Sequence, residues 1–284
     1  MSRIAIIGGG NIGEALLAGL LRAGRQVKDL VLVERVPARA GYLAETYSVR
    51  VTGVADAVEN ADFVVVAVKP SDVESVTDEI ADAVARDEAD SVEHVFVTVV
   101  AGVNSAFFEA KLSAGTPVIR VMPNAPMVVG AGVTAIAKGR FATAEQLKQV
   151  AALFDCVGGV LTVSESHLDA VTAVSGSGPA YFFLMVEALV DAGVAQGLSR
   201  AVATDLVVQT MAGSAAMLLE RIDEAKDGST VDTTPARLRA TVTSPAGTTA
   251  AGLAELERGG LRAAVGAAVA AARHRAGQLG VTSE

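Results

Sequence analysis

Three glycines near the start of the chain have the spacing of a loop that binds phosphate groups. Gly8, Gly10 and Gly13 form a G-x-G-x-x-G pattern directly after the apolar run 4–7 and open a helical pattern at 11–23. The first glycine permits a tight turn, the second lets the backbone approach a pyrophosphate, and the third lets helix and strand pack closely. The helix N-terminus favours negative charge. This pattern predicts a dinucleotide site.

The residue that ends the next apolar run bears on which dinucleotide would bind. That run ends on Glu34, roughly 20 residues beyond the loop, where an acid accepts hydrogen bonds from the adenosine ribose and favours NAD. Arg35 follows directly, and Arg39 lies one helical turn later. Two guanidinium groups there could instead clamp a 2′-phosphate. These residues leave both NADH and NADPH open.

Short loops of polar or small residues follow three further apolar runs. Parallel strands have their carboxyl ends at one edge of the sheet, and ligands bind at that edge. Small residues there leave room for a nicotinamide ribose, and an Asn between two prolines, as in MPNAP, lies in a rigid loop. We therefore expect these loops to line the dinucleotide site. Their residues are Lys69, Pro70, Ala101, Gly102 and Asn124.

A stretch of small residues, SGSGP at 175–179, interrupts an apolar helical pattern. Glycine and proline disfavour the interior of a helix. Pro179 is acceptable at the first position of a helix, and Ser177 or Gly178 could cap it. We therefore expect a helix to start here, with Ser175, Ser177 and Gly178 leaving space for a flat ligand.

A second polar interruption, TSPAGTT at 243–249, precedes a long helical pattern. The N–H groups from Gly247 to Thr249 would form a cradle for a carboxylate, and the hydroxyls of Thr248 and Thr249 add donors. A simple Ser/Thr helix cap is the alternative interpretation.

The elements that must position these residues alternate between strand and helix in the first part of the chain. Such alternation indicates βαβ units and a parallel sheet. Unbroken apolar runs are typical of strands buried on both faces. The predicted strands are 4–7, 30–34, 49–53, 63–68, 95–100, 117–121, 134–137 and 159–162. The predicted helices are 11–23, 37–46, 55–60, 71–85 and 144–154, and the charged stretch 86–93 is predicted to be a loop.

After Val163 the strand patterns end and the sequence becomes helical. Several of these helices have apolar residues on more than one face and must be covered by other helices. We predict a dinucleotide-binding Rossmann domain at 1–163 and a helical dimerisation and substrate domain at 164–284. The predicted helices of the second domain are 169–174, 180–195, 200–224, 234–241 and 247–279.

Composition excludes several classes of partner. The net charge is −9 with only six lysines, which argues against nucleic acid and anionic membranes as partners. The single cysteine, Cys156, excludes an internal disulfide and fits a reducing compartment. We see no signal-peptide pattern and no uninterrupted apolar run of about 18 residues, so we expect a cytoplasmic protein without a membrane span.

Several motifs resemble, in their order along the chain, those of the pyrroline-5-carboxylate reductase family, which catalyses the last step of proline biosynthesis. The resemblance covers nearly the whole chain, and the pair SGSGPAY and TSPxGTT is its most specific part. It implies a Rossmann domain, a helical domain similar to the C-terminal domain of 6-phosphogluconate dehydrogenase, and interlocked homodimers that often assemble into decamers. The motifs are GGGNIGEALLAGL, AVKP, AGV, RVMPNAP, AVSGSGPAYFF, HLDAV and VTSPAGTT.

The resemblance implies reduction of 1-pyrroline-5-carboxylate to L-proline by NADPH or NADH. The backbone amides of Thr248 and Thr249 would bind the substrate carboxylate, and the Thr249 hydroxyl would reach the ring nitrogen, which makes Thr249 the expected catalytic residue. With the patterns above, the expected cofactor-binding residues are Gly8, Gly10, Asn11, Ile12, Gly13, Glu34, Arg35, Arg39, Val68, Lys69, Pro70, Ala101, Gly102 and Asn124. The expected substrate-binding residues are Ser175, Ser177, Gly178, Asp232, Gly247, Thr248 and Thr249. No metal site is expected.

The chain departs from the family pattern at three positions. Ala246 precedes Gly247 where two glycines are usual, Ala240 stands where an acid is common, and Glu34 stands where a neutral residue is common. The last departure bears on the choice between NADH and NADPH.

Other functions remain as alternatives. A serine hydrolase could use Ser177, but the G-x-S-x-G pattern lacks its first glycine and no strand precedes it. A non-catalytic NAD(P) sensor should lack the second polar stretch. A related imine reductase is compatible with the motifs, whereas β-hydroxyacid enzymes need a helix lysine, and the second domain has only Lys226 in a polar run.

Overall fold

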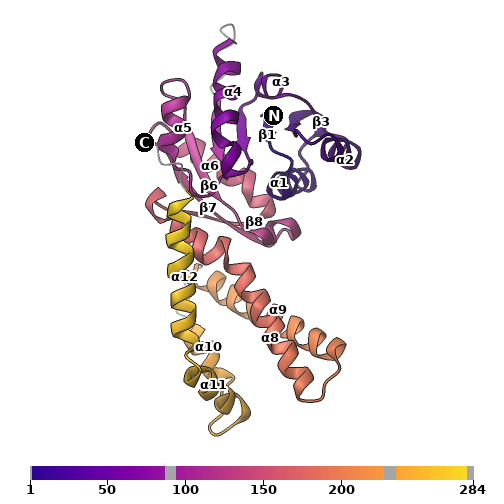
Figure 1. Ribbon diagram of the computed structural model, residues 1–284, viewed down its shortest axis with the longest axis vertical. Coiled ribbons are helices and arrows are strands. Elements are labelled where there is room, and N and C mark those ends of the chain that lie inside the picture. Colours follow the sequence, from indigo (N-terminus) through magenta and orange to yellow (C-terminus); the bar gives the residue numbers. More distant parts are fainter. Residues whose placement is uncertain (1, 87–93, 227–234, 280–284) are drawn as a thin grey trace. The chain divides into compact units, whose positions relative to one another are not determined.

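The computed structural model describes residues 2–86, 94–226 and 235–279 (Figure 1). The chain forms two compact units, one of Met1–Pro179 with Val269–Glu284 and the other of Ala180–Ala268. The domain division predicted at residue 163 stays a prediction, because the helical segment after it is counted with the sheet in this division. The loop predicted over 86–93 lies outside the described residues, apart from Arg86 at the end of a helix.

The first unit is built on a sheet of eight strands in the order β3-β2-β1-β4-β5-β6-β7-β8. All neighbouring pairs are parallel except β6 and β7, which run antiparallel. The eight predicted strands are therefore present, but the sheet is not wholly parallel. The strands are β1 (Ile4–Ile7), β2 (Leu30–Val33), β3 (Arg50–Val51), β4 (Phe63–Val66), β5 (Val95–Thr98), β6 (Val118–Met122), β7 (Gly132–Lys138) and β8 (Gly158–Thr162).

Helices cover both faces of this sheet, because successive strand residues point to opposite faces and both sets are apolar. Ile4 and Ile6 of β1 pack in one cluster with α1 and α6, whereas Ala5 and Ile7 pack in another with α3, α4 and α5. The α-helices are α1 (Asn11–Arg22), α2 (Pro37–Tyr47), α3 (Val54–Val58), α4 (Val73–Arg86), α5 (Ser105–Lys111) and α6 (Ala144–Phe154). Short 3-10 turns are η1 (Val27–Asp29), η2 (Pro70–Asp72), η3 (Ala125–Val129) and η4 (Asp155–Val157).

The chain leaves the sheet through a continuous helical segment. The turn η5 (Glu165–His167) and α7 (Leu168–Val171) lead into a π-helix, η6 (Thr172–Gly176), and α8 (Gly178–Ala195) follows. The Ser177 N–H donates to the Thr172 carbonyl at 2.8 Å, five residues back, as in a π turn. A helix thus starts at Gly178, inside SGSGP as expected, whereas Ser177 before it has helical dihedrals and not the extended backbone typical of an N-cap.

The second unit is helical, as the sequence predicts. Its elements include α8, α9 (Arg200–Lys226), α10 (Pro235–Thr241), α11 (Thr248–Arg258) and the first part of α12 (Leu261–Gln278). The single helix predicted over 247–279 is wrong. The chain breaks it at Gly259 and Gly260, and Gly260 has a φ of +75°, a conformation that an α-helix cannot contain.

The helices α8 and α9 expose apolar side chains. Phe182, Phe183 and Leu184 are each more than 60% exposed in the single chain. By length and composition alone, Glu165–Ala195 and Arg200–Ile222 could each cross a membrane, in contrast to the expectation of no such span. Helices of soluble proteins that are covered by other protein pass the same test. The exposed apolar side chains of α8 and α9 therefore need to be buried against another surface.

Candidate active site

The glycine loop after β1 is shaped by close backbone contacts. Gly8 has a φ of +113°, and its N–H donates to the Val33 carbonyl at 2.9 Å. A Cβ on Gly13 would lie 2.0 Å from the Gly8 carbonyl oxygen, so only glycine lets α1 begin so near the strand. A Cβ on Gly10, in contrast, would meet no atom within 4 Å. The loop is therefore closed on its inner side and open at Gly10.

The N-terminus of α1 provides hydrogen-bond donors beside this open position. The first intrahelical bond runs from the Glu14 N–H to the Gly10 carbonyl at 2.9 Å. The N–H groups of Asn11, Ile12 and Gly13 have no acceptor within the helix, as at any helix N-terminus. The open space at Gly10 and these donors fit a pyrophosphate, which the helix dipole also favours.

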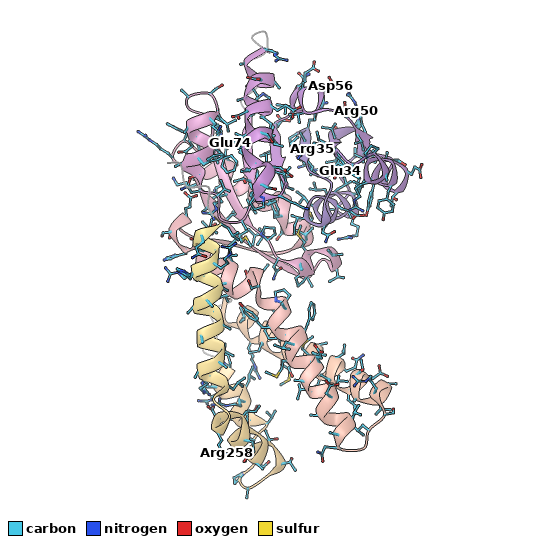
Figure 2. The ribbon with its side chains drawn as sticks, in the orientation of Figure 1. Glu34, Arg35, Arg50, Asp56, Glu74 and Arg258 are labelled. Carbon is cyan, nitrogen blue, oxygen red and sulfur yellow. The ribbon has the colours of Figure 1, made fainter. Side chains whose placement is uncertain are left out.

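The acid that ends the second strand is tied to the same loop. The Glu34 carboxylate accepts the Gly9 N–H at 3.1 Å and the Val36 N–H at 2.8 Å (Figure 2). A carboxylate has four lone-pair sites, so it can still accept hydrogen bonds from ribose hydroxyls. The contact of Glu34 with an adenosine ribose stays a prediction, and the structure places its carboxylate against the glycine loop.

Both arginines near the predicted adenosine site have carboxylate partners. Arg39 pairs with Glu14 and also donates from Nε to the Gly9 carbonyl at 2.9 Å. The exposed Arg35 lies 3.1 Å from Asp72. Burial alone raises the pKa of Glu14, but hydrogen bonds from Arg39 and Tyr47 outweigh it and hold the pKa below its ordinary value. Arg39 therefore helps to hold the glycine loop in place. Arg35 forms only an exposed ion pair, which constrains its side chain less.

The loops after β1, β2, β4, β5 and β6 all lie at the carboxyl edge of the parallel strands, since these strands are in register and neighbours in the sheet. Gly102 has a φ of +81°, which glycine adopts easily, and Lys69 is exposed. The structure thus gathers at one edge Gly8, Gly10, Asn11, Ile12, Gly13, Glu34, Arg35, Val68, Lys69, Pro70, Ala101, Gly102 and Asn124.

The predicted substrate residues of the SGSGP segment contact the end of β6. The Asn124 side-chain amide donates to the Ser175 carbonyl at 3.3 Å, while its Oδ1 accepts the Val133 N–H at 2.9 Å. The Ser175 hydroxyl donates to the Val171 carbonyl at 3.1 Å. A Cβ on Gly178 would meet no atom within 4 Å, so this position faces open space.

The second polar stretch forms the start of a helix in the second unit. Gly247 is the N-cap of α11, with extended dihedrals and no side-chain cap, and Thr248 is the first helical residue. The N–H groups of Thr248 and Thr249 point out of the helix end, as a carboxylate cradle requires. Ala246, at the family's usual glycine position, has a φ of +56°. Asp232 lies outside the described residues.

Sequence reasoning missed a buried ion cluster behind the SGSGP segment. Arg120 in β6 has a side chain only 7% exposed and lies 3.6 Å from Glu165 and 3.5 Å from Asp169. Glu165 also accepts the Ser105 N–H and hydroxyl, both at 2.6 Å. The sequence does contain one signal of this cluster, the single charged residue Arg120 inside the apolar run VIRVM. A charged side chain that is buried needs partners.

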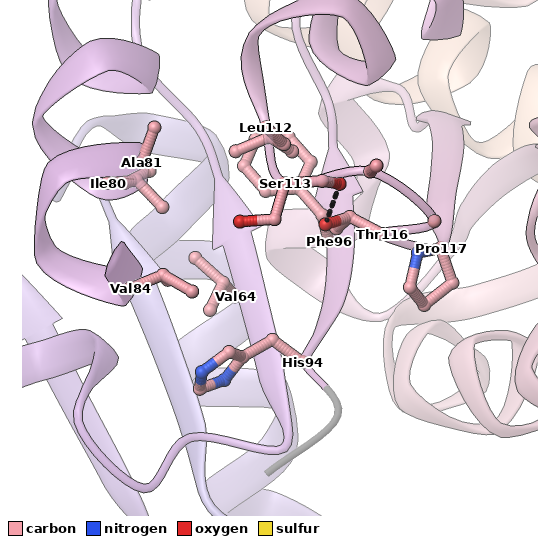
Figure 3. A pocket seen from close by; sticks show the side chains of 12 residues that line it. Val64, Ile80, Ala81, Val84, His94, Phe96, Leu112, Ser113, Thr116 and Pro117 are labelled. Carbon is pink, nitrogen blue, oxygen red and sulfur yellow. Dashed lines mark hydrogen bonds between the residues drawn. The ribbon is translucent and has the colours of Figure 1, made fainter. Parts of the chain in front are cut away.

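A separate pocket of about 250 Å³ lies at the opposite, amino edge of the sheet (Figure 3). It is mainly apolar, with Val64, Phe96 and Pro117 among its lining residues, and His94 lies at one side. The His94 Nδ1 is already 2.6 Å from the Ala61 carbonyl. This pocket is not part of the loops at the carboxyl edge.

The hydrolase alternative finds no support. Ser177 lies at the end of a π-helix and not in a strand–turn–helix elbow. The nearest histidine in sequence, His167, has its Nδ1 3.0 Å from the Ser164 hydroxyl. Within the described ranges, no group of three or more His, Cys, Asp or Glu is placed to hold a metal ion.

A parallel sheet with a glycine loop at its carboxyl edge, followed by a helical unit, defines the class of dinucleotide-dependent oxidoreductases with a Rossmann-type domain. Residues 3–102 match the family NADP oxidoreductase coenzyme F420-dependent, and residues 165–279 match the family Pyrroline-5-carboxylate reductase dimerisation. The chain belongs to the pyrroline-5-carboxylate reductase family, and the predicted family and fold class are confirmed.

The relatives match along nearly the full length. Pyrroline-5-carboxylate reductases of Mycobacterium tuberculosis and Mycobacterium leprae are 70% and 68% identical, covering 100% of this chain and 99% of each relative. The reductase structure from Coxiella burnetii has a TM-score of 0.87 at 32% identity and covers 99% of both chains. A Plasmodium falciparum pyrroline carboxylate reductase structure with NADP bound has a TM-score of 0.80 at 27% identity, covering 98% of both chains.

Proposed function

We propose that this chain reduces 1-pyrroline-5-carboxylate to L-proline with NADPH or NADH. The observation that carries the proposal is the 70% identity over its whole length to a pyrroline-5-carboxylate reductase. The open glycine loop at Gly10 supports it, because this position leaves room for a dinucleotide. Proline biosynthesis in the cytoplasm follows as the physiological setting, and the single cysteine, Cys156, fits a reducing compartment.

The residues at the carboxyl edge hold the dinucleotide in this proposal. The donors of Gly10, Asn11, Ile12 and Gly13 bind the pyrophosphate, and Glu34 with Arg35 face the adenosine ribose. The small residues Ala101 and Gly102, with the loop Val68–Pro70, leave a slot for the nicotinamide half. When bound, the dinucleotide supplies a hydride to the carbon of the C=N bond.

The N-terminus of α11 binds the substrate carboxylate in this proposal. The N–H groups of Thr248 and Thr249 donate hydrogen bonds to it, and Gly247 allows the close approach. The Thr249 hydroxyl hydrogen-bonds to the ring nitrogen. A protonated imine is already a good electrophile, so the protein's main contribution is to position two bound reactants. Ser175, Ser177, Gly178 and Asp232 complete the proposed substrate set.

A homodimer covers the exposed apolar helices in this proposal. Residues 165–279, which match the dimerisation family, contain both segments that are long and apolar enough for a membrane. Apolar faces of this kind are typical of obligate interfaces between subunits. We expect a detergent-free dimer or a decamer built from dimers in light scattering. A chain that stays aggregated without detergent and becomes monodisperse only in micelles would favour a membrane location instead.

The test of the activity is oxidation of NADPH and NADH, followed side by side, with 1-pyrroline-5-carboxylate as substrate. Turnover that produces L-proline supports the proposal. No oxidation of either dinucleotide, with both still bound in a fluorescence titration, would favour a non-catalytic sensor. Turnover with another cyclic imine or a β-hydroxyacid but not with this substrate would favour a related reductase.

A further inference from the structure

One face of β6 and its extension contacts the helical segment that leads to SGSGP. Three alternate residues, Arg120, Met122 and Asn124, point toward it, as every second residue of a strand does. We call these three the bracing residues. Arg120 pairs with Glu165 and Asp169 near the start of the segment, as described above.

The other two bracing residues contact the end of the segment. The Met122 methyl carbon lies 2.7 Å from the position of a Cβ on Gly176, so the backbone there packs directly against the side chain. Asn124 donates to the Ser175 carbonyl at 3.3 Å. From Arg120 to Met122 and Asn124, the contacts thus move from the start of the helical segment to its end at Ser175 and Gly176.

The stretch of β6 with its extension and the helical segment that it contacts have similar lengths. Four residues of strand from Arg120 to Asn124 span about 13 Å. Ten residues of helix from Glu165 to Ser175 span about 15 Å. Because the lengths agree, the bracing residues can hold both ends of the segment without bending it.

The Ser175 end of the segment contains the π-helix. Single π turns inside helices are rare and frequently lie at functional sites. The Thr172 and Ser175 hydroxyls donate to carbonyls four residues back, to Leu168 at 2.8 Å and to Val171 at 3.1 Å. Their donors are therefore used inside the segment, and the side chain that reaches the Ser175 carbonyl from outside is that of Asn124.

We propose that Asn124 is a positioning residue for the imine substrate: by holding the Ser175 carbonyl, it fixes the turn Ser175–Gly178 against which the substrate ring lies. This inference rests on the proposed function. It gives Asn124 a role other than the direct contact with the dinucleotide that the sequence suggests, since each polar atom of this side chain has a protein partner.

The test is Asn124→Asp. Aspartate keeps the oxygen that accepts the Val133 N–H but places a second oxygen, in place of the amide donor, against the Ser175 carbonyl. We expect the KM for 1-pyrroline-5-carboxylate to rise at least tenfold, while the Kd of NADPH and NADH, measured by fluorescence titration, stays within twofold. The matched control is Asn104→Asp, since the Asn104 oxygen accepts the Phe107 N–H at 2.9 Å and aspartate caps a helix equally well.

An unchanged KM in Asn124→Asp would overturn the proposal, and a parallel rise in the dinucleotide Kd would restore the role of Asn124 as a dinucleotide contact. If wild type shows no turnover with this substrate, it is the proposed function that fails.

Should Asn124→Asp not fold, Gly176→Ala tests the same brace, because the new methyl group displaces Met122. It should raise the same KM, Gly176→Ala with Met122→Ala should restore it, and no rise in Gly176→Ala would overturn the proposal.

Discussion

The Glu34 carboxylate accepts a hydrogen bond from the Gly9 N–H at 3.1 Å, so the acid that ends β2 is held against the glycine loop that follows β1. The contact places a negative charge at the predicted ribose site and fixes it there. The two arginines that follow it in sequence have other carboxylate partners, Asp72 for Arg35 and Glu14 for Arg39. Discrimination between the two dinucleotides should therefore depend on Glu34.

Removing this charge should improve the use of NADPH relative to NADH. In Glu34→Gln, a 2′-phosphate no longer faces a carboxylate, so we expect the ratio of kcat/KM for NADPH to that for NADH to rise about tenfold, which corresponds to about 1.4 kcal/mol. Steady-state kinetics with each dinucleotide measures this ratio. Glu59→Gln, the same change in an exposed residue at the end of α3, should leave it unchanged. A ratio that does not move in Glu34→Gln would contradict a role for this carboxylate.

Two glycines of the loop should respond differently to the same substitution. A Cβ at Gly10 meets no atom, and its φ of −68° suits alanine, so Gly10→Ala should keep its Tm but bind NADPH and NADH at least tenfold more weakly. Gly13→Ala places a Cβ against the Gly8 carbonyl and should lose about 1–3 kcal/mol of stability through overpacking. Thermal unfolding and fluorescence titration separate the two effects. Normal dinucleotide binding by Gly10→Ala would show that the phosphates lie elsewhere.

The pairing of Glu14 should make part of the stability sensitive to acid. Because the pKa of Glu14 in the folded chain lies below its ordinary value of 4.5, this pair stabilises the fold above pH 4.5 and loses its effect as the pH falls through the folded value. The stability difference between wild type and Glu14→Gln should be largest near pH 7 and shrink below pH 4.5. Urea unfolding at several pH values tests this, and a difference independent of pH would rule it out.

Ala246 should be a site where glycine stabilises the chain. Its φ of +56° is costly for a residue with a Cβ, and glycine relieves that cost at the expense of more freedom in the unfolded chain. We expect Ala246→Gly to gain roughly 0.5–1 kcal/mol. In Ala254→Gly, within α11, the same change should lose about 1 kcal/mol. Chemical denaturation compares the two, and a loss in both would mean that Ala246 is not strained.

The hydroxyl of Thr249 should matter for turnover more than for substrate binding. Thr249→Val removes the proposed hydrogen bond to the ring nitrogen and keeps the backbone N–H groups of the helix end. We expect kcat to fall about 10- to 100-fold, the range of about 1.4 to 2.8 kcal/mol for a bond made in the transition state, with little change in KM. Thr249→Ser should recover most of the activity. Unchanged kinetics in Thr249→Val would remove Thr249 from the proposed mechanism.

The sheet could be predicted from sequence because its central strands β1, β2 and β4 are short and fully apolar and are followed by helical patterns. The helix Ala144–Phe154 was predicted with its observed bounds, since Thr143 and Gln146 form a capping box that marks its start. Whether β7 runs parallel or antiparallel to β6 could not be predicted, because a run of apolar residues looks the same in the sequence for either direction of the strand. The helix Ser105–Lys111 was missed because its seven residues are too few to show a helical period.

The shape of the glycine loop was predicted, because a local rule fixes the backbone at Gly8, Gly10 and Gly13. The geometry was not predicted where distant residues decide it. Nothing local to SGSGP indicates a π-helix, and the side chains that contact it, Met122 and Asn124, lie more than 50 positions earlier in the chain. The partners of Arg120 lie 45 and 49 positions away in the chain, beyond the reach of any pattern of spacing.

The reversal of the chain at β7 decides where the SGSGP segment arrives. Since β7 runs against β6 and β8 runs with β7, the chain finishes its last strand heading away from the dinucleotide edge. A helix that then folds back along β6 must travel toward that edge. Had β7 been parallel to β6, the same helix would have delivered Ser175–Gly178 to the wrong end of the sheet. The single change of strand direction is thus a topological requirement for bringing the SGSGP segment and the glycine loop to one end of the domain.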